Sequence, residues 1–292
     1  MNSFTIKDLS NLSGIKAHTL RIWEQRYTFL KPNRTFTNIR YYNNEELKTI
    51  LNIALLNKYG FKISHIDKMT GQEVQDKILS LNQTQAQQER LVNQLIQAMV
   101  DLEIESFEKT LNQYIASKGI EKTITQIIFP FLEKIGILWM TNHINPTQER
   151  LVTNVIRQKL INGIEQVKPL LTSDKKIILF LPEGEHHELG LLFMYFLLKS
   201  RGIYVWYLGA NIPLKDVDYL VNLKKPDYLY CHLTTVGQSF NFDRFLTQLG
   251  VMFKGLPTVI SGQLTNTYGK KITPPIVFKR SFPEVMEFIS SL

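Results

Sequence analysis

The chain has 292 residues, of which 44% are hydrophobic and 21% charged, and at this length two or three globular domains are expected. Its apolar runs are too short to span a bilayer, and its first residues lack the basic start and apolar core of a signal peptide. The single cysteine, Cys231, excludes an internal disulfide framework and a cysteine-based zinc site. We therefore expect a cytoplasmic protein without a membrane partner.

The formal charge of +8 is distributed unevenly along the chain. Residues 1–70 hold eleven Lys and Arg against five Asp and Glu, whereas the rest of the chain is close to balance. A basic segment confined to one terminus indicates a polyanionic partner for that segment alone.

The first segment predicts two short helices and a turn. Ile6, Leu9 and Leu12 recur at helical spacing, Gly14 breaks the pattern, and a second helix follows from about residue 17 to residue 27. Such a pair forms a helix-turn-helix, whose second helix fits the major groove. The polar residues available on its outer side are Lys16, His18, Thr19, Arg21, Gln25 and Arg26.

A turn-rich hairpin is predicted from Leu30 to Tyr42, as a wing that lies along the DNA backbone. A third helix begins with Asn43 or Asn44 as its cap, and Glu45 and Glu46 then occupy its first turn, near the positive end of the helix dipole.

Residues 4–69 resemble the DNA-binding domain of the MerR family of transcription regulators. The matching residues are Thr19–Tyr27, Pro32, Arg34–Thr35, Arg40–Tyr42, Glu45–Leu47 and Gly60–Ile66. The resemblance implies sequence-specific binding of double-stranded operator DNA through Lys16, His18, Thr19, Arg21, Arg26, Arg34, Arg40 and Tyr41. One such module contacts only about 600–1,000 Å² of DNA, so we expect a homo-oligomer, dimer or tetramer, with RNA polymerase as a further candidate partner.

The middle of the chain predicts helices. The polar stretch from Val74 to Arg90 is typical of a partly exposed connecting helix, and strong helical spacing begins at Leu91. Further helical segments run from about residue 120 to residue 139 and from Pro146 to Val167. Four antiparallel helices would bury their apolar stripes in a bundle, where Trp139 is by pattern a core residue.

The last segment alternates strands and helices. Short apolar strands are predicted at 177–181, 204–208, 228–232, 258–261 and 276–278, with helices at about 188–199, 214–222, 242–249 and 283–290. This alternation predicts a doubly wound parallel sheet. No Gly-x-Gly-x-x-Gly pattern follows the first strand, so dinucleotide binding is not supported. Instead, two histidines and three glutamates crowd the loop after that strand, where open α/β sheets bind ligands.

Glu185, His187 and Gly190 follow the spacing acid, one residue, His, two residues, Gly, and the surrounding sequence resembles the flavodoxin-like cobalamin-binding domain. The resemblance implies that His187 coordinates cobalt in place of the vitamin's own benzimidazole. Glu185 would orient the imidazole, and Gly190 would let its helix pack beside the displaced nucleotide tail. The residues implied to line the tail pocket are Leu233, Thr235, Ser261, Gly262 and Gln263, with Ser261 standing where the family has a glycine.

Trp139 and Glu149, separated by nine residues, match the helical cap of such proteins, in which the two side chains lie at the adenosyl face. A MerR-type domain with this cap is similar to the CarH and LitR photoreceptor group, which uses adenosylcobalamin as a light-sensitive ligand. The chain departs from that pattern at Arg150 and at Met140, where histidines are usual. His143 is a substitute only if the helix geometry differs.

The sequence therefore predicts a winged helix-turn-helix of MerR type at 1–70, a linker helix at 71–90, a four-helix-bundle cap at 91–172 and a cobalamin-binding α/β domain at 173–292. The leading hypothesis is a transcription regulator, a repressor rather than an enzyme, whose oligomeric state and DNA affinity are controlled by cobalamin.

Three alternatives stay open. The α/β domain could act without B12, through a protein partner, or it could be a methyl or radical carrier of an enzyme. The third alternative is a zinc site at His186, His187 and Glu188, which is disfavoured because adjacent helical residues do not point the same way.

Overall fold

The computed structural model describes residues 2–140, 145–234 and 240–292, except for the side chains of residues 137–140. The described chain forms two compact units, Met1–Val155 and Ile156–Leu292. The boundary falls within the long helix α10 (Pro146–Gln166), whose two halves therefore belong to different units.

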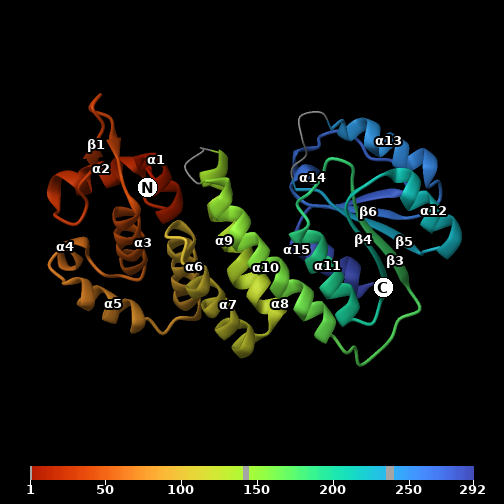
Figure 1. Cartoon of the computed structure of the whole chain (residues 1–292), viewed down its shortest axis with the longest axis horizontal. Helices are drawn as coiled ribbons and strands as arrows, with labels where there is room; N and C mark the ends of the chain where they lie inside the picture. Colours follow the sequence, from red (N-terminus) through yellow and green to blue (C-terminus); the bar gives the residue numbers. More distant parts are fainter. Residues whose placement is uncertain (1, 141–144, 235–239) are drawn as a thin grey trace. The chain divides into compact units, whose positions relative to one another are not determined.

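The first unit begins with the predicted helix-turn-helix and wing (Figure 1). It contains α1 (Ile6–Ser13), α2 (Ala17–Arg26), the antiparallel hairpin β1 (Asn33–Arg34) and β2 (Arg40–Tyr41), α3 (Asn44–Lys58) and α4 (Ile63–Ile66). Gly14 ends α1 in the left-handed conformation, with φ of 73°, which glycine adopts without strain. Asn43 and Glu46 form the capping box of α3, so the predicted start of this helix is confirmed.

The prediction of a single connecting helix over residues 74–90 is wrong. The structure has α5 (Gly71–Leu79) and α6 (Thr84–Val100) instead, with Thr70 as the N-cap of α5. The hydroxyl of Ser80 donates a hydrogen bond to the Lys77 carbonyl, and Leu81 turns into the core with 7% of its surface exposed. The helix ends here because the chain turns to bury Leu81. This is a tertiary effect, which the local spacing of residues does not indicate.

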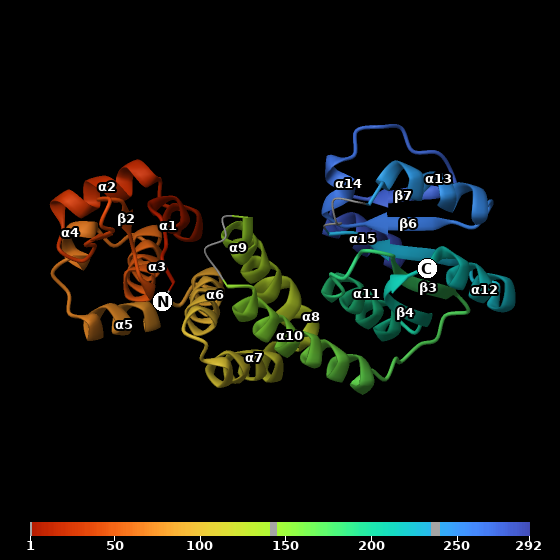
Figure 2. The same cartoon turned by 45° about the horizontal axis from the view of Figure 1, so that its top comes forward.

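The helical region continues with α7 (Ile104–Lys118), α8 (Ile120–Thr123), the π-helical turn η1 (Ile124–Ile128), α9 (Phe129–Met140) and the first half of α10. Figure 2 shows α6, α7 and α9 side by side. Their core holds Leu95, Ile96 and Met99 of α6, and the rings of Phe107 and Phe131 meet edge to face at 5.4 Å. The predicted helical region is confirmed, and the apolar stripes account for its packing.

The second unit contains a five-stranded parallel sheet. Its strands are β3 (Lys176–Pro182), β4 (Tyr204–Ile212), β5 (Tyr228–His232), β6 (Thr258–Ser261) and β7 (Ile276–Lys279), in the order β4-β3-β5-β6-β7. This is the flavodoxin-like order, so the predicted fold class is confirmed. The prediction ended β4 at residue 208, four residues early, and omitted the short helix α14 (Gln263–Thr267).

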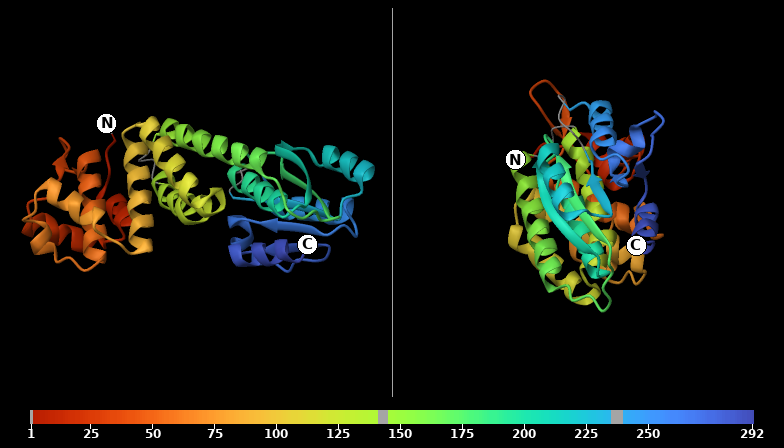
Figure 3. Two further views of the ribbon diagram at one scale, coloured as in Figure 1. Left: turned by 90° about the horizontal axis from the view of Figure 1, so that it is seen from below. Right: turned by 90° about the vertical axis from the view of Figure 1, so that its right-hand side faces the viewer.

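Helices cover both faces of the sheet (Figures 1 and 3). α11 (Leu189–Ser200) and α15 (Phe282–Ser290) lie on one face, and α12 (Leu214–Lys224) and α13 (Phe242–Met252) lie on the other. The strand order reverses direction between β3 and β5, so the loops that follow these two strands leave the sheet toward opposite faces. Ligands of open α/β sheets bind at this point, which therefore positions the candidate site.

Candidate functional site

α2 presents a polar outer surface. Its inner residues Leu20 and Trp23 are buried, which fixes the face that α2 turns to the protein core. On the other side the exposed predicted residues are Lys16, which is the N-cap, His18, Arg21 and Arg26, while Thr19 is half-buried.

Glu24 joins this helix to the wing. Its side chain is 7% exposed, accepts a hydrogen bond from the hydroxyl of Tyr42, and lies 3.6 Å from Nε of Arg40. Burial, followed by the bond to Glu24, raises the pKa of Tyr42, so the phenol stays protonated and keeps donating. The predicted wing residue Arg40 is therefore positioned by an acidic residue of α2.

The hairpin tip projects polar and apolar groups together. Arg34 Nη1 donates to the side-chain oxygen of Asn38 at 2.7 Å, which orients this predicted contact residue along the hairpin. Tyr41 is half-buried, whereas Phe36 and Ile39 are exposed.

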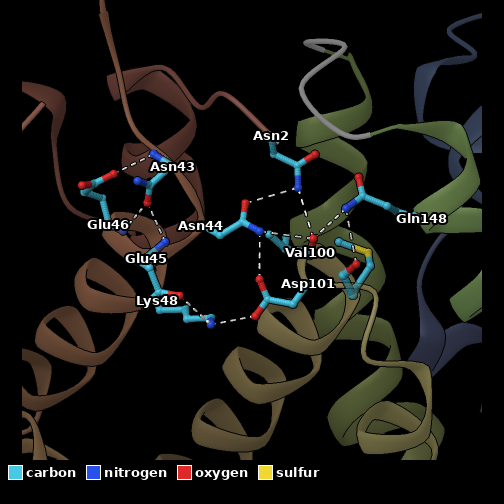
Figure 4. Close-up of polar contacts among 10 residues, drawn as sticks. Asn2, Asn43, Asn44, Glu45, Glu46, Lys48, Val100, Asp101 and Gln148 are labelled. Atoms are coloured by element: carbon cyan, nitrogen blue, oxygen red, sulfur yellow. Dashed lines mark hydrogen bonds and ion pairs between the residues drawn. The ribbon is translucent and has the colours of Figure 1, made fainter. Parts of the chain in front are cut away.

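A polar joint links the helix-turn-helix to the helical region (Figure 4). The carbonyl oxygen of Val100, at the end of α6, accepts hydrogen bonds from Asn2 at 3.2 Å, from Asn44 at 3.4 Å and from Gln148 at 2.8 Å. Asp101 accepts from Asn44 at 2.8 Å and pairs with Lys48 at 2.7 Å. The first turn of α3 and the first turn of α10 therefore share one acceptor.

The loop after β3 is a tight turn that fixes a histidine. Gly184 has φ of 84°, and its N–H donates to the Asn211 side chain at the end of β4. The Glu185 side chain is fully buried; its Oε1 accepts from the His187 backbone N–H and lies 2.7 Å from His187 Nδ1. Burial alone would raise the pKa of Glu185, but these bonds outweigh it and hold that pKa below its ordinary value.

This pair can serve as a metal ligand. An ionised carboxylate at Nδ1 selects the tautomer in which Nε2 carries the lone pair, and it also raises the basicity of the ring. The side chain of His187 is 44% exposed, so the ring is accessible from outside the domain. Oε2 of Glu185 is buried without a hydrogen-bond partner in the described part of the chain. An imidazole held in this way fits a metal centre such as the cobalt of a corrinoid, which His187 would hold through Nε2.

Glu188, one residue beyond the histidine, anchors the start of α11. Its carboxylate accepts from the Tyr207 hydroxyl at 2.6 Å and lies 3.4 Å from Arg157 of the second half of α10. The pKa of Tyr207 is raised by burial and by this bond. Glu188 is therefore engaged in packing, and no group of three or more metal-binding side chains gathers among the described residues.

The space beside Gly190 is filled by the chain itself. A Cβ on Gly190 would overlap the imidazole of His232, the last residue of β5. Nδ1 of His232 lies 2.8 Å from Oγ of Ser261, which in turn lies 2.6 Å from the hydroxyl of the buried Tyr230. Burial lowers the pKa of His232 to about 4, so the ring is neutral near pH 7. The close approach expected at Gly190 is made by His232.

Three of the remaining predicted residues, Leu233, Ser261 and Gly262, are backbone neighbours at the ends of β5 and β6. Leu233 is buried in the core on the α12 and α13 side, Gly262 has φ of 99° and lies against the Leu233 carbonyl, and Gln263 is exposed. Thr235 lies outside the described residues. Ser261 is 2% exposed.

Of the predicted cap residues, Glu149 is half-buried in the first turn of α10 and Arg150 is exposed. Trp139 and Met140 are in α9, but their side chains lie outside the described residues, as does His143 altogether.

The site includes residues that sequence reasoning missed. His232 and Tyr230 alternate with Cys231 along β5, and this period of two could have placed both on one face of the sheet. Glu24 lies one position after the buried Trp23, and an acidic residue amid arginines was a signal that it pairs with them. Gln148 carried no signal, because its partner is a backbone carbonyl.

Two family models match the chain. Residues 4–73 match the MerR HTH family regulatory protein model, and residues 91–161 match the B12 binding domain model. No helix of the described chain has the length and apolarity to cross a bilayer.

Known proteins are similar to this chain over most of its length. The HTH-type transcriptional repressor CarH of Myxococcus xanthus is 24% identical over 91% of this chain and 91% of its own length. CarA, a repressor of the same organism, is 28% identical over 76% of this chain and 73% of its own. Among solved structures, the monomethylamine corrinoid protein of Methanosarcina barkeri has a TM-score of 0.51 at 12% identity, covering 70% of this chain and 99% of that one, a likeness of fold.

These matches agree with the order of elements derived above, and both curated relatives are transcriptional regulators. The chain carries a MerR helix-turn-helix followed by a B12-binding domain and is homologous to the repressors CarH and CarA.

Proposed function

We propose that the chain is a sequence-specific DNA-binding repressor whose oligomeric state and DNA affinity are controlled by cobalamin, with adenosylcobalamin as the ligand. The observation that carries the ligand half of this proposal is the buried Glu185 carboxylate holding Nδ1 of His187 at the switch point of the sheet.

The DNA half rests on surface chemistry. Arg21 and Arg26 of α2 would reach base edges and phosphates in the major groove, while Arg34, Arg40 and Tyr41 of the wing would contact the backbone. Lys16, His18 and Thr19 lie at the start of α2, the end that reads base edges in helix-turn-helix domains. The net positive charge of residues 1–70 supports the same surface.

Bound cobalamin would supply a cobalt centre whose lower coordination position accepts an imidazole nitrogen. His187 would occupy that position and Glu185 would fix the direction of its ring. Such a ligand changes assembly only through its different affinities for the assembled and dissociated states. Assembly in turn changes DNA affinity, because two recognition helices on a two-fold operator bind more tightly than one.

The test uses the purified full chain with adenosylcobalamin in the dark. We expect a spectrum of histidine-ligated, base-off cobalamin, a larger species in size-exclusion chromatography and tighter operator binding. His187→Ala should remove the spectral features of histidine ligation. His186 is an exposed residue of the same loop, and His186→Ala should leave these features unchanged. Unchanged assembly and operator affinity on adding the ligand would refute control by cobalamin.

Light sensitivity is tested separately, because the cobalt–carbon bond of the adenosyl form is photolabile. Illumination of the loaded protein should reverse the gain in size and in operator affinity. If methylcobalamin and adenosylcobalamin behave alike in the dark and illumination changes neither, the response is to B12 level and not to light.

A second function is favoured by one observation. The His232 ring lies where a ligand group beside Gly190 would go, which fits a domain that has lost B12 and acts through a protein partner. Under this alternative, added corrinoid shows no spectral sign of histidine ligation and does not change the size of the assembly. The protein then binds its operator with full affinity in the absence of ligand.

A further inference from the structure

We propose that His232 is a specificity-determining residue that occupies the position of the corrinoid's nucleotide tail, so that it weakens the binding of adenosylcobalamin relative to a corrinoid without a lower nucleotide. This inference rests on the proposed function, because it concerns the same ligand site.

The geometry of ligation requires room for the tail. In cobalamin the benzimidazole nucleotide is tethered to the corrin and reaches the lower face of cobalt. If His187 takes that coordination position, the displaced nucleotide stays on the lower face and must enter the domain near His187. Two residues here are small: Gly190, which lies three residues after His187 in the first turn of α11, and Ser261, which ends β6.

The room that these small residues create is taken by His232. Its ring lies directly against Gly190, and Ser261 holds it at 2.8 Å through Nδ1. Below it, Tyr230 is fully buried and stacks on Phe288 of α15 at 6.3 Å. Tyr230 and His232 point to the same face of β5, so both side chains occupy space between this strand and the helices that cover the face.

Entry of a nucleotide therefore requires His232 to leave. The ring would lose its hydrogen bond to Ser261 and its contact with Gly190. The hydroxyl groups of Ser261 and Tyr230, which also bond to each other, would then have to reorient. A ligand without the nucleotide makes no such demand. Loss of one partly buried hydrogen bond and of ring packing corresponds to about tenfold or more in affinity.

The experiment measures dark binding of adenosylcobalamin and of adenosylcobinamide, which has the same corrin and adenosyl group but no nucleotide, by equilibrium dialysis and absorption spectra. The proteins are the full chain and its His232→Gly and His232→Ala variants, with His186→Ala as the control. We expect the His232→Gly variant to bind adenosylcobalamin at least about tenfold more tightly than the unaltered chain does. Its affinity for adenosylcobinamide should be unchanged.

Three results would count against the inference. Equal changes for both ligands would mean that His232 acts on the corrin and not on the tail. No change for either ligand would mean that the ring moves aside without penalty, and the proposed function would survive. No binding of either ligand to any variant would refute corrinoid sensing itself, and the inference with it.

Folding is checked independently, because His232 is partly buried. Circular dichroism and melting temperature should show that the variants remain folded. Ser261→Ala keeps the imidazole and removes its hydrogen bond, together with the bond between Ser261 and Tyr230, so it should raise adenosylcobalamin affinity in the same direction by a smaller factor. An opposite change in this variant would overturn the role given to the Ser261 bond.

Discussion

Glu185 carries the most consequential single contact of the α/β unit. Its carboxylate is removed from water, yet hydrogen bonds from His187 keep its pKa below the ordinary value of 4.5. A carboxyl group whose pKa is lower in the folded state stabilises the fold above its unfolded pKa. That stabilisation is lost as the pH falls through the folded pKa. Near neutral pH it is therefore fully present.

We predict that Glu185→Gln lowers the melting temperature near pH 7, because a neutral amide accepts the two bonds from His187 more weakly than a carboxylate does, at a cost of about 1–3 kcal/mol. The difference from the unaltered chain should shrink below about pH 4, where the native carboxylate becomes protonated. Thermal melts followed by circular dichroism across this range provide the measurement. A difference that grows in acid would contradict the assignment of Glu185 as ionised.

At this scale the sequence predicted the pair but not its surroundings. The spacing of Glu185 and His187 indicated a carboxylate beside an imidazole, and the structure places them 2.7 Å apart. The neighbour of Gly190 was expected to be a ligand and is His232. Strand alternation gives the face of β5 to which His232 belongs, but the side chain that fills a gap between two elements depends on packing across the sheet.

At the scale of elements, the joint around Val100 connects the start of α3 with the start of α10. Asn44 donates to Asp101, and Gln148 donates to the same Val100 carbonyl that Asn44 and Asn2 reach. Glu149, which the resemblance predicts to lie at the adenosyl face of the ligand, follows Gln148 directly. Any shift in the first turn of α10 therefore acts on an acceptor that also holds the DNA-binding domain.

We predict that Asn44→Asp weakens this joint, since it removes the donor and sets a second carboxylate against Asp101, with a cost of about 1–3 kcal/mol. The double variant with Asp101→Asn should recover much of the loss, because the new amide can donate to the new carboxylate. Melting temperatures of the four proteins form a double-mutant cycle. Strictly additive effects would show that the two side chains do not interact.

The elements themselves were predictable where the pattern was strong. Five strands and their covering helices followed from apolar runs and spacing, as did the cap at Asn43. The break between α5 and α6 was not predictable, because it depends on the burial of Leu81, which local spacing does not indicate. The joint was also unpredictable, since three of its hydrogen bonds go to a backbone carbonyl that has no sequence signature.

For the molecule as a whole, charge separates the two activities that we propose. Residues 1–70 carry most of the net charge of +8, whereas the remainder is close to neutral. Binding of polyanionic DNA should then depend on cations of the first segment and not on the overall charge of the chain. Because DNA binding releases counterions, the logarithm of the binding constant falls linearly with the logarithm of the salt concentration. The magnitude of this slope decreases by about 1 for each phosphate contact removed.

We predict that Arg34→Ala weakens operator binding about equally on all sequences and reduces the salt slope by about 1, because a wing arginine contacts phosphates. Arg21→Ala on α2 should instead cost about 1–3 kcal/mol mainly on the operator and narrow the preference for it over random DNA. Lys224→Ala removes the same charge from the α/β unit and serves as the matched control. Fluorescence anisotropy at several salt concentrations measures the affinity of each of the three variants for operator and for random DNA. An equal loss with Lys224→Ala would mean that DNA responds to the summed charge of the molecule, and the assignment of binding to α2 and the wing would then fail.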